Sequence, residues 1–180
     1  MLSVIRRAVA VASLVVVSAS AAQAQIELRE IRIDLASVTS VDGNTTLSLG
    51  GPTSRIGGLA GAPASVSLGV YLNDKLALEP SFSIVNVSPD VGDATTFIGL
   101  GLWAPYYLNS GKAGLFVAPG VEILKQTDVD AMIDFGADVG YKRAINDNVS
   151  WRAAAGFRTG DMTNDELALV ATFGFSWFLK

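Results

Sequence analysis

The chain has 180 residues, half of them hydrophobic and 17% charged, and it contains neither cysteine nor histidine. This length fits one domain, and the missing residue types exclude disulfides and zinc sites built on thiolate or imidazole ligands. The formal net charge is −4 and no basic stripe occurs, which argues against a nucleic-acid partner.

The first 24 residues have the features of a secretory signal peptide. Arg6 and Arg7 form a basic start, residues 8–22 form an apolar run too short to span a membrane, and residues 22–24 form an A-x-A cleavage motif. We therefore expect a signal peptide over residues 1–24 and one mature domain over residues 25–180. Without the two arginines, 11 basic residues stand against 17 acidic ones, a net charge of −6.

The stretch 26–50 is the hardest to interpret. Residues 30–38 and 45–50 both alternate between apolar and polar side chains, and Asp42-Gly43 between them is a hairpin signal. Seven further strands are expected after residue 64, so two strands here would make nine. Single-chain bacterial barrels have even strand numbers. We therefore expect one strand ending near Leu49, with Asp42-Gly43 as a bulge or as the join to an N-terminal extension.

Seven further segments alternate with a period of two, the pattern of β-strands. They cover residues 65–72, 75–87, 95–108, 113–124, 131–142, 149–158 and 167–180. Their lengths of about 8–14 residues bracket the roughly 9–11 residues with which a tilted strand crosses a bilayer. No mature segment offers the long apolar run of a transmembrane helix.

The connections between these segments alternate in length. Short turns are expected at residues 73–74, 109–112 and 146–148, and longer links at 51–64, 88–94, 126–130 and 159–166. In membrane barrels the short turns face the periplasm and the long loops face outside, so eight strands place both termini on the periplasmic side. The sequence predicts an all-β fold, an eight-stranded antiparallel up-and-down transmembrane β-barrel.

The two faces of the strands differ in a way that favours a membrane. One face carries large apolar side chains and almost no charge, while the other mixes glycine with charges of both signs. A soluble barrel would show the charged face to water, whereas a membrane barrel encloses it. The alternative is a secreted, lipocalin-like barrel with an apolar ligand cavity.

We expect a lumen charge network formed by Glu79, Glu122, Asp134, Asp138, Lys142, Arg152 and Arg158. With a turn centred on Asn146, Asp134 would face Arg158 across the hairpin, and Arg152 would lie diagonal to Asp138. An eight-stranded interior is just wide enough for side chains to fill it, which favours an ion-pair plug over the alternative of a narrow ion path.

Aromatic side chains on the apolar face fit the girdles of membrane barrels. The expected lipid-facing aromatic residues are Tyr106, Tyr141, Trp151, Phe173, Phe175 and Trp177. Ordinary barrel packing is the alternative explanation of these rings.

Three segments resemble the small outer-membrane β-barrel proteins of Gram-negative bacteria, the broad OmpA/OmpX-like class. They are "YLNDKLALEPSFSI" (71–84), "GLGLW" (99–103) and "FGFSWFL" (173–179). The resemblance implies a location in the outer membrane and insertion by the barrel-assembly machinery, which reads a C-terminal strand that usually ends in an aromatic residue. This chain departs from that pattern because it ends in Leu179-Lys180.

The composition disfavours enzyme chemistry. The outer-membrane barrel enzymes that act on lipids or peptides rely on histidine, which this chain lacks, and no phosphate-binding glycine motif with lysine is present. We expect no catalytic residue, no cofactor and no metal site. Acidic loop residues could bind divalent cations among lipopolysaccharide phosphates, although solvated charge is the simpler interpretation.

The expected function is a non-enzymatic structural or surface-interaction role in the outer membrane. The alternatives are a porin-like narrow conduit for small or hydrophobic molecules, and the soluble ligand-binding barrel. The expected partners are outer-membrane lipid and lipopolysaccharide, and the expected oligomeric state is a monomer.

Overall fold

The computed structural model describes residues 27–41, 44–49, 65–87, 95–109, 113–126, 130–161 and 167–179. The expected signal peptide, residues 1–24, and most of the four longer links lie outside these ranges. Within the described ranges, no helix is long and apolar enough to cross a membrane.

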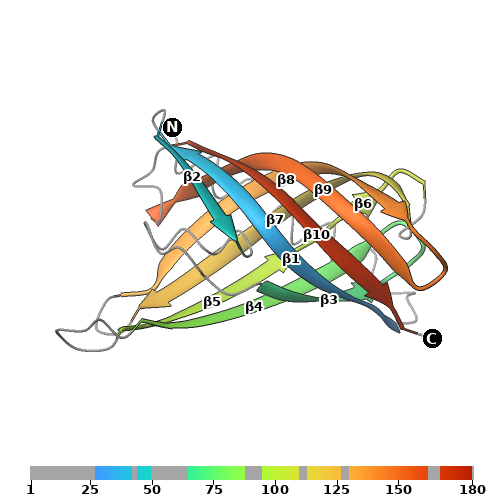
Figure 1. The fold of residues 1–180 in the computed structure, drawn as a ribbon, viewed down its shortest axis with the longest axis horizontal. Coiled ribbons are helices and arrows are strands. Elements are labelled where there is room, and N and C mark those ends of the chain that lie inside the picture. Colours follow the sequence, from blue (N-terminus) through green and yellow to red (C-terminus); the bar gives the residue numbers. More distant parts are fainter. Residues whose placement is uncertain are drawn as a thin grey trace.

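The described residues form one antiparallel sheet that closes on itself (Figure 1). Its strands are β1 (Glu27–Val41), β2 (Asn44–Leu49), β3 (Ser65–Tyr71), β4 (Ala77–Val87), β5 (Thr95–Trp103), β6 (Tyr106–Tyr107), β7 (Gly114–Gln126), β8 (Met132–Ala144), β9 (Val149–Gly160) and β10 (Ala168–Phe178). Closure comes from β1, which pairs with β10 along most of its length. Eight positions run around the wall in the order β1, β3, β4, β5, β7, β8, β9, β10, so the predicted eight-stranded antiparallel barrel is confirmed.

The prediction of a single strand before Leu49 is wrong, because β1 and β2 form a hairpin. Val41 pairs with Asn44 and Ala36 pairs with Leu49. Strand β1 pairs with β10 along one edge. Along its other edge, residues 27–34 pair with β3 and residues 36–41 pair with β2. The extra strand therefore shares a position with β3, and the wall still has eight positions.

Strand β6 continues β5 past a break at Ala104 and Pro105. Proline has no N–H, so it cannot donate to the ladder. The Pro105 carbonyl still accepts from the Ala77 N–H at 3.1 Å, and the Ala104 N–H donates to the Pro119 carbonyl at 2.9 Å. The predicted strand over 95–108 is thus interrupted without a change of register.

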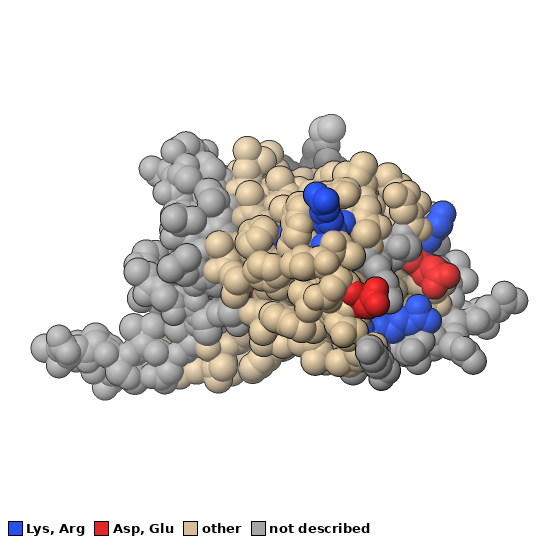
Figure 2. Space-filling model, turned by 45° about the vertical axis from the view of Figure 1, so that its right-hand side comes forward, with Lys and Arg blue, Asp and Glu red and all other residues tan. Residues whose placement is uncertain are grey.

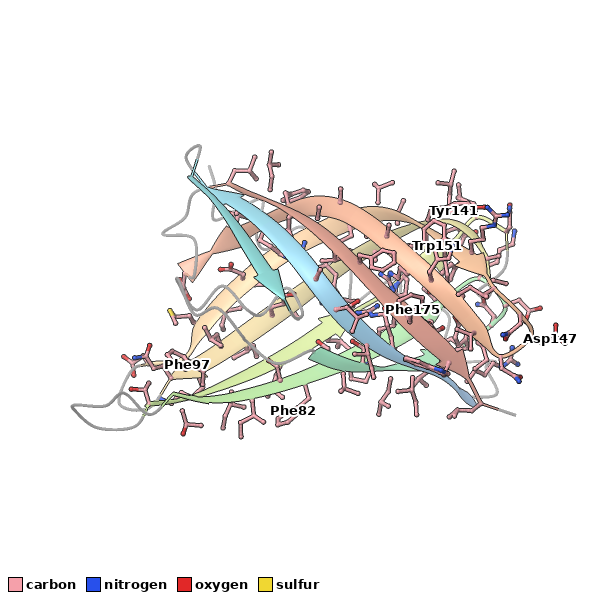
Figure 3. All side chains as sticks on the ribbon, viewed as in Figure 1. Phe82, Phe97, Tyr141, Asp147, Trp151 and Phe175 are labelled. Carbon is pink, nitrogen blue, oxygen red and sulfur yellow. The ribbon has the colours of Figure 1, made fainter. Side chains whose placement is uncertain are left out.

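The wall has an apolar outside and a polar inside, because successive side chains of a strand point to opposite faces. On the outside, Phe82, Leu100 and Val139 are 48%, 49% and 59% exposed. Figure 3 shows Phe82 pointing away from the barrel, and the wall in Figure 2 is largely free of charged atoms. On the inside lie glycines, serines and charged residues, together with a buried aromatic cluster of Tyr71, Trp103, Tyr107 and Phe116.

One end of the barrel gathers the start of β1, the end of β10 and short turns. Glu30 pairs with Phe178, and the Phe178 N–H donates to the carbonyl of Asn148 in the β8–β9 turn at 2.8 Å. Arg29 also reaches Asp74 of the β3–β4 turn at 3.4 Å. We call this the short-turn end; Figure 1 marks the C-terminus beside it.

Candidate functional site: the charged interior

The barrel interior holds ten charged side chains that are almost completely buried among the residues the structure describes. None of these ten is more than 7% exposed. They are Glu30, Arg32, Asp34, Glu79, Glu122, Asp134, Asp138, Lys142, Arg152 and Arg158. The seven residues expected in the lumen all belong to this set, and they separate into two clusters.

Glu79 is the centre of the first cluster, which we call the Glu79 cluster. Arg152 donates from Nη1 to both Glu79 carboxylate oxygens, at 2.7 and 3.0 Å, and Arg32 donates to the same carboxylate. Arg32 also binds Asp34 at 3.2 Å and the Ser67 hydroxyl at 3.0 Å. Each guanidinium therefore has a buried carboxylate partner, the condition under which buried charge is tolerated.

Lys142 and Glu30 complete the Glu79 cluster nearer the short-turn end. The Lys142 ammonium lies 2.5 Å from the Glu30 carboxylate, and Tyr71 donates its hydroxyl to that carboxylate at 2.6 Å. Aromatic rings surround the ammonium, with the Phe178 ring centroid 4.8 Å away and the Tyr107 centroid 5.2 Å away. The lysine is thus held by a carboxylate and by the faces of two rings.

The second cluster lies around Arg158, nearer the opposite end, and we call it the Arg158 cluster. Arg158 forms a two-pronged contact with Asp138, at 2.7 and 3.2 Å, and lies 3.7 Å from Glu122. Its guanidinium stacks on the Trp103 ring at 4.1 Å. Asp134 is the fourth member and interacts electrostatically with Arg158.

Two interior glycines let aromatic rings lie flat against the wall. A β-carbon on Gly120 would come within 2.3 Å of the Trp103 ring, and one on Gly140 within 2.2 Å of the Phe116 ring. Such distances are far below contact, so any side chain there would displace the ring. The Phe116 ring in turn carries the Arg152 guanidinium at 4.1 Å. These glycines therefore set the position of two of the buried arginines.

The predicted pairings within the β8–β9 hairpin are wrong. Asp134 pairs with Gly160, and Arg158 lies opposite Gly136, so the turn centres on Asp147 and not on Asn146. The Asn146 side chain accepts from the N–H groups of Asn148 and Val149, both at 2.9 Å, which fixes this register. Arg158 consequently binds Asp138, its diagonal neighbour, and Arg152 is free to reach Glu79 across the lumen.

Three interior charges on β1 were missing from the predicted network. Glu30, Arg32 and Asp34 are all less than 7% exposed. The alternation of residues 30–35, with Ile31 and Ile33 between these charges, is the signal that identifies them. They were missed because the placement of the first strand was open, so its two faces were not assigned.

The charges of the two clusters balance differently. The Glu79 cluster has three acidic and three basic members, whereas the Arg158 cluster has three acidic members and one basic member. Within the described residues, no group of three or more acidic, histidine or cysteine side chains is arranged to hold a metal ion. The two clusters fill the lumen with hydrogen-bonded side chains that come from opposite walls.

The six aromatic residues expected to face lipid lie on strands β6, β8, β9 and β10. Tyr106, Tyr141, Phe173 and Trp177 are 41–47% exposed on the outer surface. Trp151 and Phe175 are half-buried on the same face, where the Trp151 ring packs against the rings of Tyr141 and Phe173. Figure 3 shows Tyr141 and Trp151 toward the end of the barrel that also holds Asp147.

Comparison with known proteins shows the fold. No protein-family model matches the chain, and no curated protein is similar to it in sequence. Among solved structures, Neisserial surface protein A (NspA) superimposes with a TM-score of 0.58 at 11% identity, over 86% of this chain and 99% of that one. The attachment invasion locus protein Ail of Yersinia pestis gives a TM-score of 0.46 at 11% identity, over 84% and 97%. NspA and Ail are small outer-membrane β-barrels of eight strands.

Proposed function

We propose that this chain is an integral β-barrel of the bacterial outer membrane with a non-enzymatic structural or surface-interaction role. The observation that carries the proposal is the inversion of its two faces: charged side chains point inward and apolar side chains outward, the reverse of a soluble barrel. Ten charged side chains are buried inside, while large apolar side chains such as Leu100 and Val139 are about half exposed outside. In water this surface would be a large exposed apolar patch, and in a bilayer it meets acyl chains.

The same inversion argues against a secreted lipocalin-like barrel. A cavity for an apolar ligand needs an apolar lining, whereas this lumen is crossed by ion pairs centred on Glu79 and Arg158. The placement we propose has the short-turn end and both termini in the periplasm and the longer links outside. We also propose that the signal peptide directs export, that the barrel-assembly machinery inserts the chain, that lipopolysaccharide is a neighbour and that the protein is a monomer.

Membrane residence is tested by fractionation and by gel migration. We expect the protein in the outer-membrane fraction, released only by detergent, and a folded band that shifts when the sample is boiled. Recovery from the periplasm without detergent would contradict the membrane placement. A band whose position does not depend on boiling would contradict a stable barrel.

We propose further that the ion pairs close the lumen. Support comes from their reach, because Glu79 on β4 and Arg152 on β9 meet from opposite sides of the wall. In planar bilayers we expect no sustained single-channel current from the wild type, and none from Arg158→Ala, because the Glu79 cluster still fills the lumen. Sustained currents that change on Arg158→Ala would contradict a sealed plug.

A narrow conduit is the second candidate function. It is favoured by the excess of carboxylates in the Arg158 cluster, where Glu122, Asp134 and Asp138 face a single guanidinium. A conduit of this kind would select cations. Cation-selective currents whose size falls in the variant Glu122→Gln would favour this function over the plug.

A further inference from the structure

We propose that the outer face of β8, β9 and β10 near the short-turn end binds one glycerophospholipid with an anionic headgroup. Arg143 would hold the phosphate, and the adjoining rings would hold the glycerol and the start of an acyl chain. The inference deepens the proposed function, because it rests on the barrel lying in a membrane.

The aromatic side chains on this face form one continuous cluster across three strands. The Tyr141 and Trp151 ring centroids lie 5.8 Å apart, those of Trp151 and Phe173 6.4 Å, and those of Phe173 and Phe175 5.4 Å. Leu35, Leu68 and Val117 are among the outward residues of β1, β3 and β7. The outward rings of Phe82 on β4 and Tyr106 on β6 take no part in these ring pairs, so the cluster lies on the side of β8, β9 and β10. Tyr and Trp favour the level where headgroups meet acyl chains.

Arg143 adds a positive charge at the edge of this cluster. Arg143 lies directly opposite Trp151 in the β8–β9 pairing, and Trp151 lies opposite Phe175 in the next, so the three form one row across the wall. Arg143 is exposed, and no described side chain pairs with it. By contrast, Arg29 at the same end of the barrel is paired with Asp74.

Small side chains continue from the cluster along the wall, away from the short-turn end. Ala155 lies between Val139 and Ala171, and Phe173 follows two residues beyond Ala171 on β10. These two alanines are bounded by the larger Val139 and Phe173 and, one row farther along, by Phe157 and Leu169, so they form a short apolar patch that an acyl chain can contact. From the short-turn end inward, the wall therefore carries the row of Arg143, Trp151 and Phe175, then the row of Tyr141 and Phe173, and then the small side chains of Ala155 and Ala171.

A row with charge and rings near the end of the barrel, followed by rings and then by small apolar side chains, suits a phospholipid, whose phosphate is followed by glycerol and acyl chain. A guanidinium recognises phosphate oxygens through paired N–H donors, and its charge favours an anionic headgroup over a zwitterionic one. A second copy of the chain is the competing occupant, but it would bring a like charge at Arg143 to the same edge if the two copies met symmetrically.

The test uses fluorescence quenching by brominated lipids, with the full chain in phosphatidylethanolamine vesicles that contain a minority of phosphatidylglycerol. The chain has three tryptophans, and Trp103 is only 4% exposed inside the barrel. The variant Trp177→Phe leaves Trp151 as the outward reporter, and Trp151→Phe leaves Trp177. Bromine is placed on the acyl chains of one lipid at a time.

The brominated lipid is present at the same mole fraction in both samples. We then expect brominated phosphatidylglycerol to occupy the Trp151 site about fivefold more than brominated phosphatidylethanolamine. Arg143→Gln should remove this preference, whereas Lys75→Gln should retain it, because Lys75 is an exposed cation in the β3–β4 turn on another side of the barrel. Equal quenching by both lipids, or equal loss in the two variants, would overturn the proposal. Quenching that rises only when the protein is diluted into more lipid would identify a second copy as the occupant and would also overturn it.

Failure of this site and failure of the membrane placement give different results. If Trp177 is quenched by either brominated lipid while Trp151 shows no preference, only the lipid site is wrong. If neither tryptophan is quenched, the membrane placement is wrong as well. The boiling-dependent gel shift of Arg143→Gln checks that this exposed substitution has left the barrel folded.

Discussion

Glu79 on β4 and Arg152 on β9 bind each other across the full width of the barrel. Three strands lie between them in either direction around the wall, so no pair of strands is farther apart. Two hydrogen bonds of 2.7 and 3.0 Å join the side chains, and Arg32 on β1 binds the same carboxylate from a third direction. The three side chains therefore link β1, β4 and β9 inside the lumen, although no two of these strands are neighbours in the sheet.

We expect Arg152→Met to destabilise the barrel by about 3–5 kcal/mol, because the buried Glu79 carboxylate loses one of the two arginines that bind it directly. The free energy of unfolding is measured by urea titration in lipid vesicles, following the folded band on a gel. Lys75→Met, which replaces an exposed cation in the β3–β4 turn, is the control and should change stability far less.

The double variant Glu79→Gln, Arg152→Met should cost less than the sum of the two single variants, because the uncompensated charge is removed together with its partner. Strictly additive effects would show that the two side chains do not stabilise each other. The same titration measures this coupling energy.

Tyr71→Phe should cost about 1.5–3 kcal/mol, because it removes a buried 2.6 Å hydrogen bond to the Glu30 carboxylate. Tyr106→Phe is the control, since Tyr106 is 47% exposed on the outer wall. Both are compared by urea titration. Equal stability of the two variants would mean that the hydroxyl of Tyr71 does not support Glu30.

Gly120→Ala should destabilise the barrel by about 1–3 kcal/mol through overpacking, because the new methyl group meets the Trp103 ring. The ring must then leave Arg158, so the emission of the buried tryptophan should shift. Ala155→Val adds apolar volume to an exposed position on the outer wall and should do neither. Unchanged emission in Gly120→Ala would contradict the close packing of the ring.

Lysine on the outer wall should be costly in the middle of β5 and tolerated near the short-turn end. Leu100 and Leu108 are similarly exposed, at 49% and 52%, so burial by protein does not distinguish them. We expect Leu100→Lys to cost about 2–4 kcal/mol and Leu108→Lys about 0–1 kcal/mol, because charge is costly at the bilayer midplane. Equal costs in lipid vesicles would contradict the proposed position of the membrane.

The alternation of side chains was enough to predict the barrel and the face on which most residues of the strands after residue 65 lie. Along β5, the sequence places Ile98, Leu100 and Leu102 together, and all three are exposed on the outer wall. This succeeds because period-two alternation follows from strand geometry alone and does not depend on which strand is the neighbour.

Partners that depend on register or on closure could not be predicted in the same way. The β8–β9 register turns on Asn146, whose side chain binds two backbone N–H groups and moves the turn centre by one residue. The Glu79–Arg152 contact joins residues 73 positions apart and exists only once the sheet has closed. No local pattern in the chain encodes either of these.

The pairing of β1 with β10 also determines when the barrel can be completed during folding. Glu30 and Phe178 belong to the first and last strands, so this seam is the contact of greatest sequence separation and the slowest to form. The hairpins between neighbouring strands can form earlier, and we expect the contact between Lys142 and Glu30 to form when the seam joins, because Glu30 lies on the closing strand. We expect the Lys142 and Glu30 side chains to remain hydrated until then, so that pairing of β1 with β10 is the step that desolvates them.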